Sequence, residues 1–165
     1  MPNWCENDLV CQGKKDDLIT LLHFVKGETD FDFDRIISYP IHLKKLDNAC
    51  EILSDLAQKG LIPSENVPES GYEIEGYSWC VEHWGVKWNA SEIQIEEDRE
   101  DRVTIHFNTP WAPPIPIFKK LGSLFPRIQF TLYYYERGQM FHGRLMYTKY
   151  GYDEHEGTYY GPRGG

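Results

Sequence analysis

The sequence predicts an α+β protein of the ferredoxin-like class: an antiparallel sheet with helices packed on one face, a helical insertion and an extra C-terminal hairpin strand. Apolar residues recur every three or four positions in some segments and every second position in others, which is typical of helices and strands respectively. These segments follow the order strand, helix, inserted helical region, strand, strand, helix, strand and one added strand. Because strand–helix–strand crossovers are right-handed, we expect both sheet-packing helices on one face.

The N-terminal half alternates strand and helix patterns. Residues 9–11 predict a first strand, and apolar residues at helical spacing over 18–25 predict a first helix. Residues 31–33 alternate as a short strand. A longer apolar stripe over 43–56, closed by a lysine and a glycine, predicts a second helix that belongs to the insertion. Residues 61–76 are rich in turn-forming residues without a period and predict a loop.

The insertion and the strands that follow it have clear boundaries. Ser78 is predicted to cap a short helix through Trp84 that ends at Gly85. Residues 93–108 alternate with period two around a polar turn and predict a hairpin. A proline-rich segment then leads into a helix over 117–125.

The last hairpin predicts two distinct faces. If Arg137 and Gly138 form the turn, with Gly138 at positive φ, then Tyr133 faces His142 across the pair of strands. The inward face is apolar and packs on the helices. The outward face, extended by one histidine of the earlier hairpin, is an aromatic-basic ligand-binding candidate: His106, Thr131, Tyr133, Tyr135, His142 and Arg144. Its alternative is a second core covered by the insertion or by the C-terminal segment.

The predicted domain organisation is simple. A chain of 165 residues fits one domain of ordinary size. We assign residues 1–147 to a single ferredoxin-like domain, with about 34–90 as the inserted region. Residues 148–165 are rich in glycine and tyrosine, and we interpret them as a loose tail.

Charge and cysteine content exclude several classes of function. A net charge of −9 disfavours unspecific binding to nucleic acid and to membrane surfaces. The chain shows neither a membrane-span pattern nor a signal-peptide pattern, so we expect a cytoplasmic protein. Its four cysteines are then reduced thiols without a metal-binding C-x-x-C pair, and no metal or cofactor is expected. Cys80 and His83 would share one helical face, which is half of a metal site at most; no second half is visible in the sequence, so we interpret both as buried structural residues.

Several motifs then point to a family. The chain reads MPNWCEN at 1–7, WC at 79–80, WGVKW at 84–88, FNTPWAPP at 107–114, FP at 125–126 and YYERGQMFHG at 134–143. This series resembles the YubB-type ferredoxin-like family of small proteins from bacteriophages, plasmids and bacterial genomes, along nearly the whole chain except residues 40–71. Val86 and His83 depart from the family pattern, which has threonine at the first position and usually another residue at the second. The resemblance implies the fold and an origin in mobile elements, and it implies no activity.

The tryptophan-rich motifs are the second candidate site. An indole ring offers a stacking surface and one N–H donor, so these residues either line a pocket or pin the insertion onto the sheet. The pocket candidates are Trp79, Trp84, Lys87, Trp88 and Trp111. Catalytic residues are not predicted, because no nucleophile motif or glycine-rich phosphate loop occurs; a proton transfer between Glu136 and His142 is the weakest alternative.

These observations favour a non-catalytic binding protein of phage or mobile-element type that engages a host protein or a small nucleotide, in host modulation or counter-defence. The first alternative is a nucleotide- or RNA-binding module that uses the open sheet face. The weaker alternative is a small enzyme with a site near 79–88. The ligand, the partner and the oligomeric state do not follow from the sequence.

Overall fold

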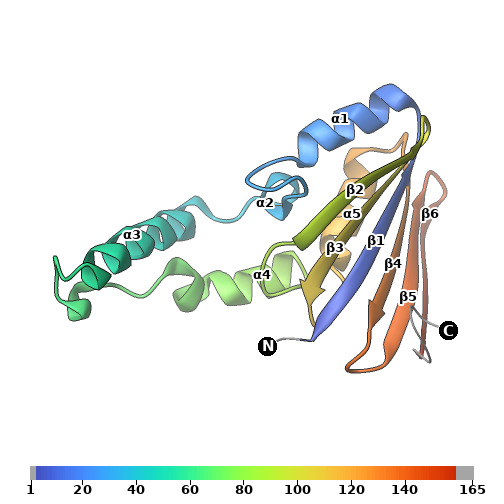
Figure 1. Cartoon of the computed structure of the whole chain (residues 1–165). Helices are drawn as coiled ribbons and strands as arrows, with labels where there is room; N and C mark the ends of the chain where they lie inside the picture. Colours follow the sequence, from blue (N-terminus) through green and yellow to red (C-terminus); the bar gives the residue numbers. More distant parts are fainter. Residues whose placement is uncertain (1–2, 159–165) are drawn as a thin grey trace.

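Six antiparallel strands form one sheet in a computed structural model that describes residues 3–158. The strand order is β2-β3-β1-β4-β5-β6, so the first strand along the chain lies inside the sheet between the third and the fourth. This arrangement confirms the predicted α+β class (Figure 1). The strands are β1 (Trp4–Gln12), β2 (Ser91–Arg99), β3 (Arg102–Pro110), β4 (Gln129–Glu136), β5 (Phe141–Thr148) and β6 (Gly151–Thr158).

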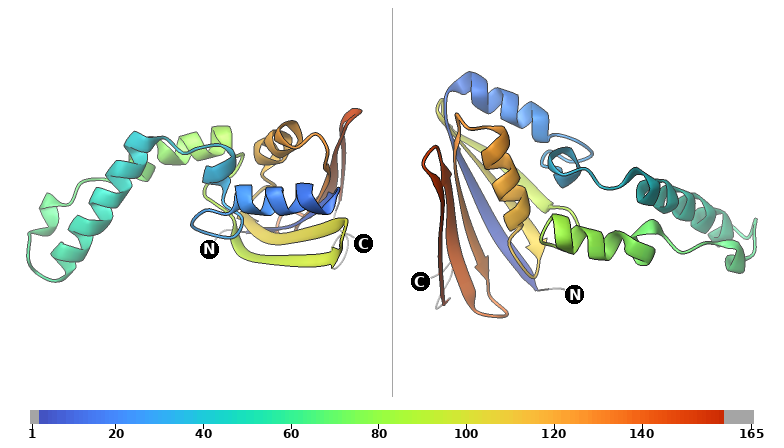
Figure 2. Two further views of the ribbon diagram at one scale, coloured as in Figure 1. Left: turned by 90° about the horizontal axis from the view of Figure 1, so that it is seen from above. Right: turned by 180° about the vertical axis from the view of Figure 1, so that it is seen from behind.

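Two helices cover one face of this sheet. α1 (Lys15–Val25) and α5 (Ile115–Leu124) lie on the same side of the strands, as the crossover argument predicts (Figure 2). Their apolar stripes and the inward residues of the central strands form the core. Its largest fully buried side chains include Leu9, Leu21, Ile105, Ile117, Phe118, Leu121, Phe130 and Leu132.

The inserted region leaves the sheet as a helical projection. It contains α2 (Phe33–Ile36), α3 (Ile41–Gln58), a 3₁₀ turn η1 (Ser64–Asn66), a π-helical turn η2 (Tyr72–Gly76) and α4 (Tyr77–His83). α3 runs away from the sheet, and the segment through η1, η2 and α4 returns beside it (Figures 1 and 2). We call residues 41–83 the insertion arm.

The first strand is longer than predicted. It begins at Trp4 rather than Leu9, because its N-terminal part alternates between buried and half-buried side chains like the rest. Asn7 hides this pattern in the sequence, since its polar side chain points into the core. There its amide donates hydrogen bonds to the carbonyl of Cys5 at 2.9 Å and to the hydroxyl of Thr109 at 2.8 Å, which satisfies a buried polar group.

Three predictions for residues 31–83 are wrong. The segment 31–33 forms a bend and the start of α2, because the Asp32 side chain caps that helix by accepting the N–H of Asp34 at 3.0 Å. The segment 61–76 is not a loop throughout, since it contains η1 and η2. α4 continues directly from η2, so Ser78 is inside the helix rather than at its cap.

The final hairpin keeps its predicted faces with a different pairing. Tyr133 pairs with Arg144 and Tyr135 with His142, which shifts the predicted partners by two residues. Because side chains alternate with period two, this shift leaves every residue on its predicted face. The positive φ of the turn is at Met140 (60°) rather than at Gly138.

The C-terminal segment contributes to the sheet. Residues predicted as the start of a loose tail form β6, which pairs with β5 from Phe141↔Thr158 to Thr148↔Gly151. The rest of the predicted tail, 159–165, lies outside the described residues. Among residues 3–158, no helix has the length and apolar character needed to cross a membrane.

Candidate functional site

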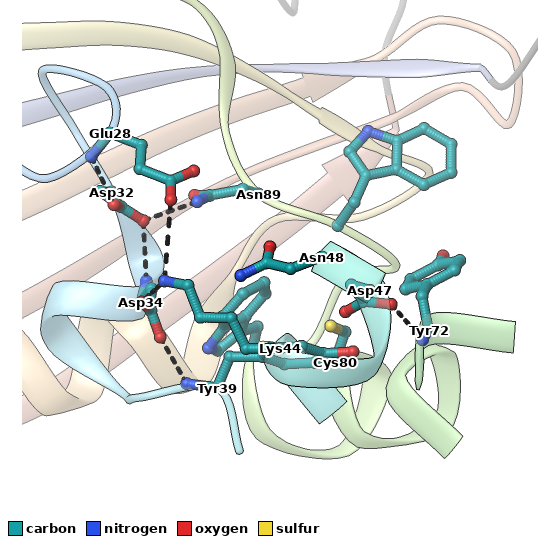
Figure 3. A pocket seen from close by; sticks show the side chains of 12 residues that line it. Glu28, Asp32, Asp34, Tyr39, Lys44, Asp47, Asn48, Tyr72, Cys80 and Asn89 are labelled. Carbon is teal, nitrogen blue, oxygen red and sulfur yellow. Dashed lines mark hydrogen bonds and ion pairs between the residues drawn. The ribbon is translucent and has the colours of Figure 1, made fainter. Parts of the chain in front are cut away.

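A pocket of about 260 Å³ lies at the root of the insertion arm, where the arm joins the sheet domain (Figure 3). We call it the root pocket. Segments far apart in the sequence meet there: the connection from α1 to α3, the first turns of α3, η2, α4 and the residues after α4. Its lining residues are Glu28, Asp32, Asp34, Tyr39, Lys44, Asp47, Asn48, Tyr72, Cys80, Trp84, Trp88 and Asn89.

Asp32 and Asn89 join the two ends of the insertion. The buried Asp32 carboxylate accepts the backbone N–H groups of Glu28 at 2.9 Å and Asp34 at 3.0 Å, and the Asn89 amide at 2.7 Å. The Asn89 side-chain oxygen accepts the N–H of Phe33 at 2.9 Å. Hydrogen bonds to a carboxylate are stronger than neutral ones, so this network holds one wall of the pocket rigidly.

A second carboxylate positions the only lysine that lines the pocket. Asp34 accepts the N–H of Tyr39 at 2.6 Å and the Lys44 ammonium at 2.9 Å. The Glu28 carboxylate lies 3.7 Å from the same ammonium. The hydrogen bond to Asp34 raises the pKa of Lys44, which therefore stays protonated.

Asp47 ties the outgoing helix of the arm to its returning segment. It accepts the backbone N–H of Tyr72 at 2.8 Å, and the Tyr72 hydroxyl donates to the carbonyl of Lys87 at 3.1 Å. Burial and the nearby Asp47 carboxylate raise the pKa of Tyr39. The Tyr39 hydroxyl oxygen is buried and lies beside the Asp47 carboxylate.

Aromatic side chains form the remaining wall. The Trp84 indole N–H donates to the carbonyl of Ile37 at 2.8 Å, which fixes the ring. The Tyr39 ring lies 6.0 Å from the Trp84 ring, centroid to centroid. Trp88 is half-exposed and packs edge-to-face on Trp4 with centroids 6.3 Å apart. Edge-to-face packing of this kind is the favoured geometry for aromatic pairs.

The structure separates the five tryptophan-region candidates. Trp84 and Trp88 line the root pocket, whereas the other three do not. Trp79 stacks on the His83 ring at 4.4 Å. The Lys87 ammonium lies 5.3 Å from the centre of the Trp111 ring, a cation–π distance.

Cys80 and His83 lack the features of a nucleophile or a metal half-site. Burial raises the pKa of Cys80 to about 12, so the thiol is protonated at neutral pH. The His83 ring places Nδ1 3.0 Å from the Trp79 carbonyl. In the described part of the chain, no group of three histidine, cysteine, aspartate or glutamate side chains is arranged to hold a metal ion.

The predicted sheet-face residues occupy one face, with a carboxylate among them. Asp8 of β1 is paired with His106 on one side and with Tyr133 on the other, and Tyr133 is paired with Arg144. The His106 Nδ1 atom lies 2.6 Å from Asp8 and its Nε2 atom 3.3 Å from Glu96. The sequence interpretation missed Asp8, because it began the first strand at Leu9 instead of Trp4.

Exposure differs across this face. The helices α1 and α5 lie on the opposite side of the sheet (Figure 2). Tyr133 is 37% exposed, whereas Thr131 is buried beneath its neighbours. The Arg144 Nε atom is buried without a hydrogen-bond partner within 3–158. A hollow of about 810 Å³ on the β1–β2–β3 part is lined by acidic residues, among them Glu6, Asp8, Glu92 and Glu96.

Glu136 and His142 lie on opposite sides of the sheet. Glu136 points inward and is buried, while His142 is in the outward register opposite Tyr135. The Glu136 carboxylate accepts the N–H of Gly138 at 2.9 Å and that of Gln139. Glu136 therefore stabilises its own turn, and the proton transfer considered from the sequence is wrong.

Comparison with known proteins supports the fold. Residues 83–161 match the family model described as "Ferredoxin-like domain in Api92-like protein". The chain is also similar to the crystal structure of the protein api92 from Yersinia pseudotuberculosis, with a TM-score of 0.60 and 13% identity over 98% of this chain and 100% of that chain. No curated protein matches the sequence significantly. The matches confirm the ferredoxin-like part of the family resemblance.

Proposed function

We propose that this protein is a non-catalytic binding protein that engages another protein through the insertion arm. The exposure of the arm carries this proposal: α3 has 18 residues, and only Leu43 among them is buried. Large apolar side chains of the arm are open to solvent on both its outgoing and its returning parts. They are Ile41, Leu46, Ile52, Leu61, Ile74, Tyr77 and Val81.

An exposed apolar surface on a projection is typical of protein-binding elements. Single apolar side chains are ordinary on any surface, so it is the number of large exposed ones on this one projecting element, seven over 41–83, that supports an interaction site. The arm also carries three lysines against eight aspartate and glutamate residues over 41–83. This composition favours a partner surface that is apolar and basic, because complementary charge steers association.

A host protein is the partner class that we favour. The motifs that resemble a family of phage and plasmid proteins support an origin in mobile elements, and host modulation or counter-defence is the role that we propose for it. Within the root pocket, the protonated Cys80 thiol supports binding rather than nucleophilic chemistry.

Site-specific photo-crosslinking tests this proposal. A benzophenone amino acid replaces Ile52 on the arm, or Ile19 on α1 as the matched exposed control, and the full chain is incubated with bacterial lysate. We expect one discrete adduct from position 52 and none from position 19. A chain with the crosslinker at position 74 should capture the same partner, and Ile52→Glu with Leu61→Glu in that chain should reduce its adduct at least tenfold. Equal adducts from both positions, or an adduct that survives the double substitution, would contradict the proposal.

The open sheet face supports a second candidate, nucleotide or RNA binding. The specific observation is the half-exposed Tyr133 ring beside Arg144, since stacking on tyrosine contributes roughly 1–3 kcal/mol per base. Fluorescence anisotropy with a single-stranded RNA oligonucleotide tests it. Tyr133→Ala with Arg144→Ala should weaken binding at least tenfold without unfolding, and superimposable titration curves would exclude this candidate.

A further inference from the structure

We infer that the continuous helix formed by η2 and α4, residues 72–83, inserts its outer side into an apolar groove of the partner that is rimmed by lysine or arginine. This inference rests on the proposed function, because it names the part of the insertion arm that makes the contact and the chemistry of the surface that receives it. It follows from a second apolar stripe on a helix whose first stripe is already packed.

The inner side of this helix is fixed to the rest of the protein. Gly76 and Cys80 are buried, and Cys80 belongs to the core. Tyr72 and Trp79 pack against the same core, and the backbone N–H of Tyr72 donates to Asp47 at 2.8 Å. These inward positions follow helical spacing, so one side of the helix is already covered within the chain.

Both ends of the helix are held as well. The Ser70 hydroxyl accepts the N–H of Glu73 at 3.1 Å, and the Glu73 carboxylate accepts the N–H of Ser70 at 3.1 Å. This reciprocal pair is a capping box, which fixes the start of a helix. At the other end, the N–H of Trp84 donates to the carbonyl of Cys80 at 2.8 Å. The helix is therefore formed before a partner binds, which lowers the entropy cost of association.

The outer side carries an apolar stripe of its own. Ile74, Tyr77 and Val81 are 57%, 43% and 43% exposed, and we call them the outer stripe. They stand at positions i, i+3 and i+7, the spacing with which a bound helix places its anchors in a groove. At 1.5 Å per residue the stripe is about 10 Å long. A surface helix is usually polar on the side away from the core, so a stripe of this kind favours a second packing partner.

The charge around the outer stripe determines the rim of the groove. The exposed residues beside it include three carboxylates, from Glu73, Glu75 and Glu82. Against them stands the ammonium of Lys87, which lies 5.5 Å from the centre of the Tyr77 ring and helps to hold that ring in place. The surroundings of the stripe are therefore acidic, and lysine or arginine side chains at the rim of the partner's groove would complement them.

The same carboxylates disfavour two other partners. The anionic head groups of a lipid surface would meet like charge. In a symmetric dimer each outer stripe would pack on its own copy, because the interface of such a dimer uses the same patch twice. Glutamates would then face glutamates. A groove on a different protein avoids both conflicts.

Photo-crosslinking from the outer stripe identifies the receiving surface. A benzophenone amino acid in place of Tyr77 keeps an aromatic ring at the centre of the stripe, and the full chain is incubated with bacterial lysate. We expect the same partner as from position 52. The crosslinked segment of the partner, read by mass spectrometry, should be apolar with lysine or arginine beside it. The captured protein is then purified, and its affinity for the full chain is measured by fluorescence anisotropy.

Two matched substitutions test the anchors. Val81→Gln and Ile19→Gln each remove an apolar side chain of nearly equal exposure, 43% on α4 and 46% on α1. The first should weaken binding about tenfold, because it takes an anchor out of the groove, and the second should leave binding unchanged. Ile74→Gln should repeat the effect of Val81→Gln. Circular dichroism of each variant checks that the fold is retained.

A second matched pair tests the basic rim. Glu75→Gln with Glu82→Gln should weaken binding about threefold and make the affinity less sensitive to salt. Glu97→Gln with Glu100→Gln changes two exposed carboxylates of the β2–β3 hairpin and should alter neither the affinity nor its dependence on salt.

Four results would overturn the inference: equal affinities of the Val81→Gln and Ile19→Gln chains, a polar or acidic crosslinked surface, a second copy of this chain in the adduct, or binding to phosphatidylglycerol vesicles that Val81→Gln abolishes. An adduct at position 52 whose partner binds the Val81→Gln chain normally would leave the proposed function intact and remove the outer stripe from it. An adduct at position 77 without one at position 52 would keep the stripe and contradict the wider use of the arm.

Discussion

The sheet domain and the insertion arm use the same apolar periodicity with opposite results. In α1 the helical spacing buries Leu18, Leu21 and Val25 against the sheet. In α3, a longer helix with an equally clear stripe, only Leu43 is buried. The difference arises because the sheet supplies a second layer for α1, whereas α3 faces only the short returning segment of the arm. An amphipathic pattern therefore predicts a helix and not whether its apolar side is covered.

The two regions also differ in what holds them together. The sheet domain is stabilised by a continuous apolar core, with side chains such as Phe130 and Ile105 fully buried. The arm adds only Cys80 to that core, with Tyr72 and Trp79 packed against it, and is otherwise held by polar contacts at its root, above all those of Asp32, Asn89 and Asp47. Regions with few buried apolar contacts open at low free energy, so we expect the arm to open before the sheet domain unfolds.

A pair of matched leucine substitutions should show the largest contrast. Leu132→Ala removes a side chain that is 1% exposed and should lower the free energy of unfolding by about 2–5 kcal/mol, through lost burial and the cavity left behind. Leu61→Ala, at 68% exposure in the arm, should change it by about 0.5 kcal/mol or less. Urea denaturation followed by tryptophan fluorescence and circular dichroism measures both. Similar losses would show that the arm contributes to the core.

A glycine in the arm should show a smaller effect confined to that region. A Cβ at Gly71 would collide with the backbone of Leu43, so Gly71→Ala must push the returning segment away from α3 at a cost of about 1–3 kcal/mol. Hydrogen exchange should show lost protection of the Tyr72 N–H, which Asp47 accepts.

Gly60 is the control for that substitution. It has positive φ (70°) and open space around its Cβ position, so Gly60→Ala costs about 1–2 kcal/mol through backbone strain alone. Protection at Tyr72 should then stay at the level of the unmodified protein. Unchanged exchange in the Gly71 variant would contradict the close packing of the two arm segments.

Cysteine labelling should show the smallest effect, a difference in labelling rate between cysteines exposed by local opening of the arm and cysteines exposed only by unfolding of the whole protein. Cys50 on α3 is half-buried, Cys80 is buried at the arm root and Cys11 is buried in the sheet domain. Pulsed iodoacetamide labelling of the native protein, read by mass spectrometry, should modify Cys50 first, then Cys80 as the arm opens, and Cys11 only on global unfolding. Labelling of Cys11 as fast as Cys80 would remove the distinction between the two regions.

Period-two and helical patterns predicted much of the sheet domain correctly. The faces of the last hairpin are right although the pairing of Tyr133 is shifted by two residues. Side chains alternate between the two faces along a strand, so a shift by an even number of residues keeps each side chain on the same face. The strand β6 was missed, since its inward positions include Glu154 and Glu156 at an exposed sheet edge, and no apolar alternation appears there. Acidic residues on an edge strand also discourage pairing with other chains.

The root pocket was predicted only in part. Trp84 and Trp88 were candidates because tryptophans near glycine and at the ends of elements stand out in a sequence. Asp34, Asp47 and Tyr39 were not, because each is an ordinary polar residue until the arm folds back and brings them together. The spacing between Asp47 and Tyr72 contains no signal that one accepts the backbone N–H of the other.

Local sequence alone determined the types of the main elements except β6, the inward and outward faces of the last hairpin and the apolar stripe of each main helix, because these depend on side-chain spacing along one segment. The tertiary structure decided which stripe is covered, where Asp8 lies on the open face and which side chains meet at the root pocket. Those outcomes depend on contacts between residues far apart in the chain, and such contacts have no periodic signature. The exposed face of α3 and the meeting of Tyr39 with Asp47 at the root pocket are both features of that second kind.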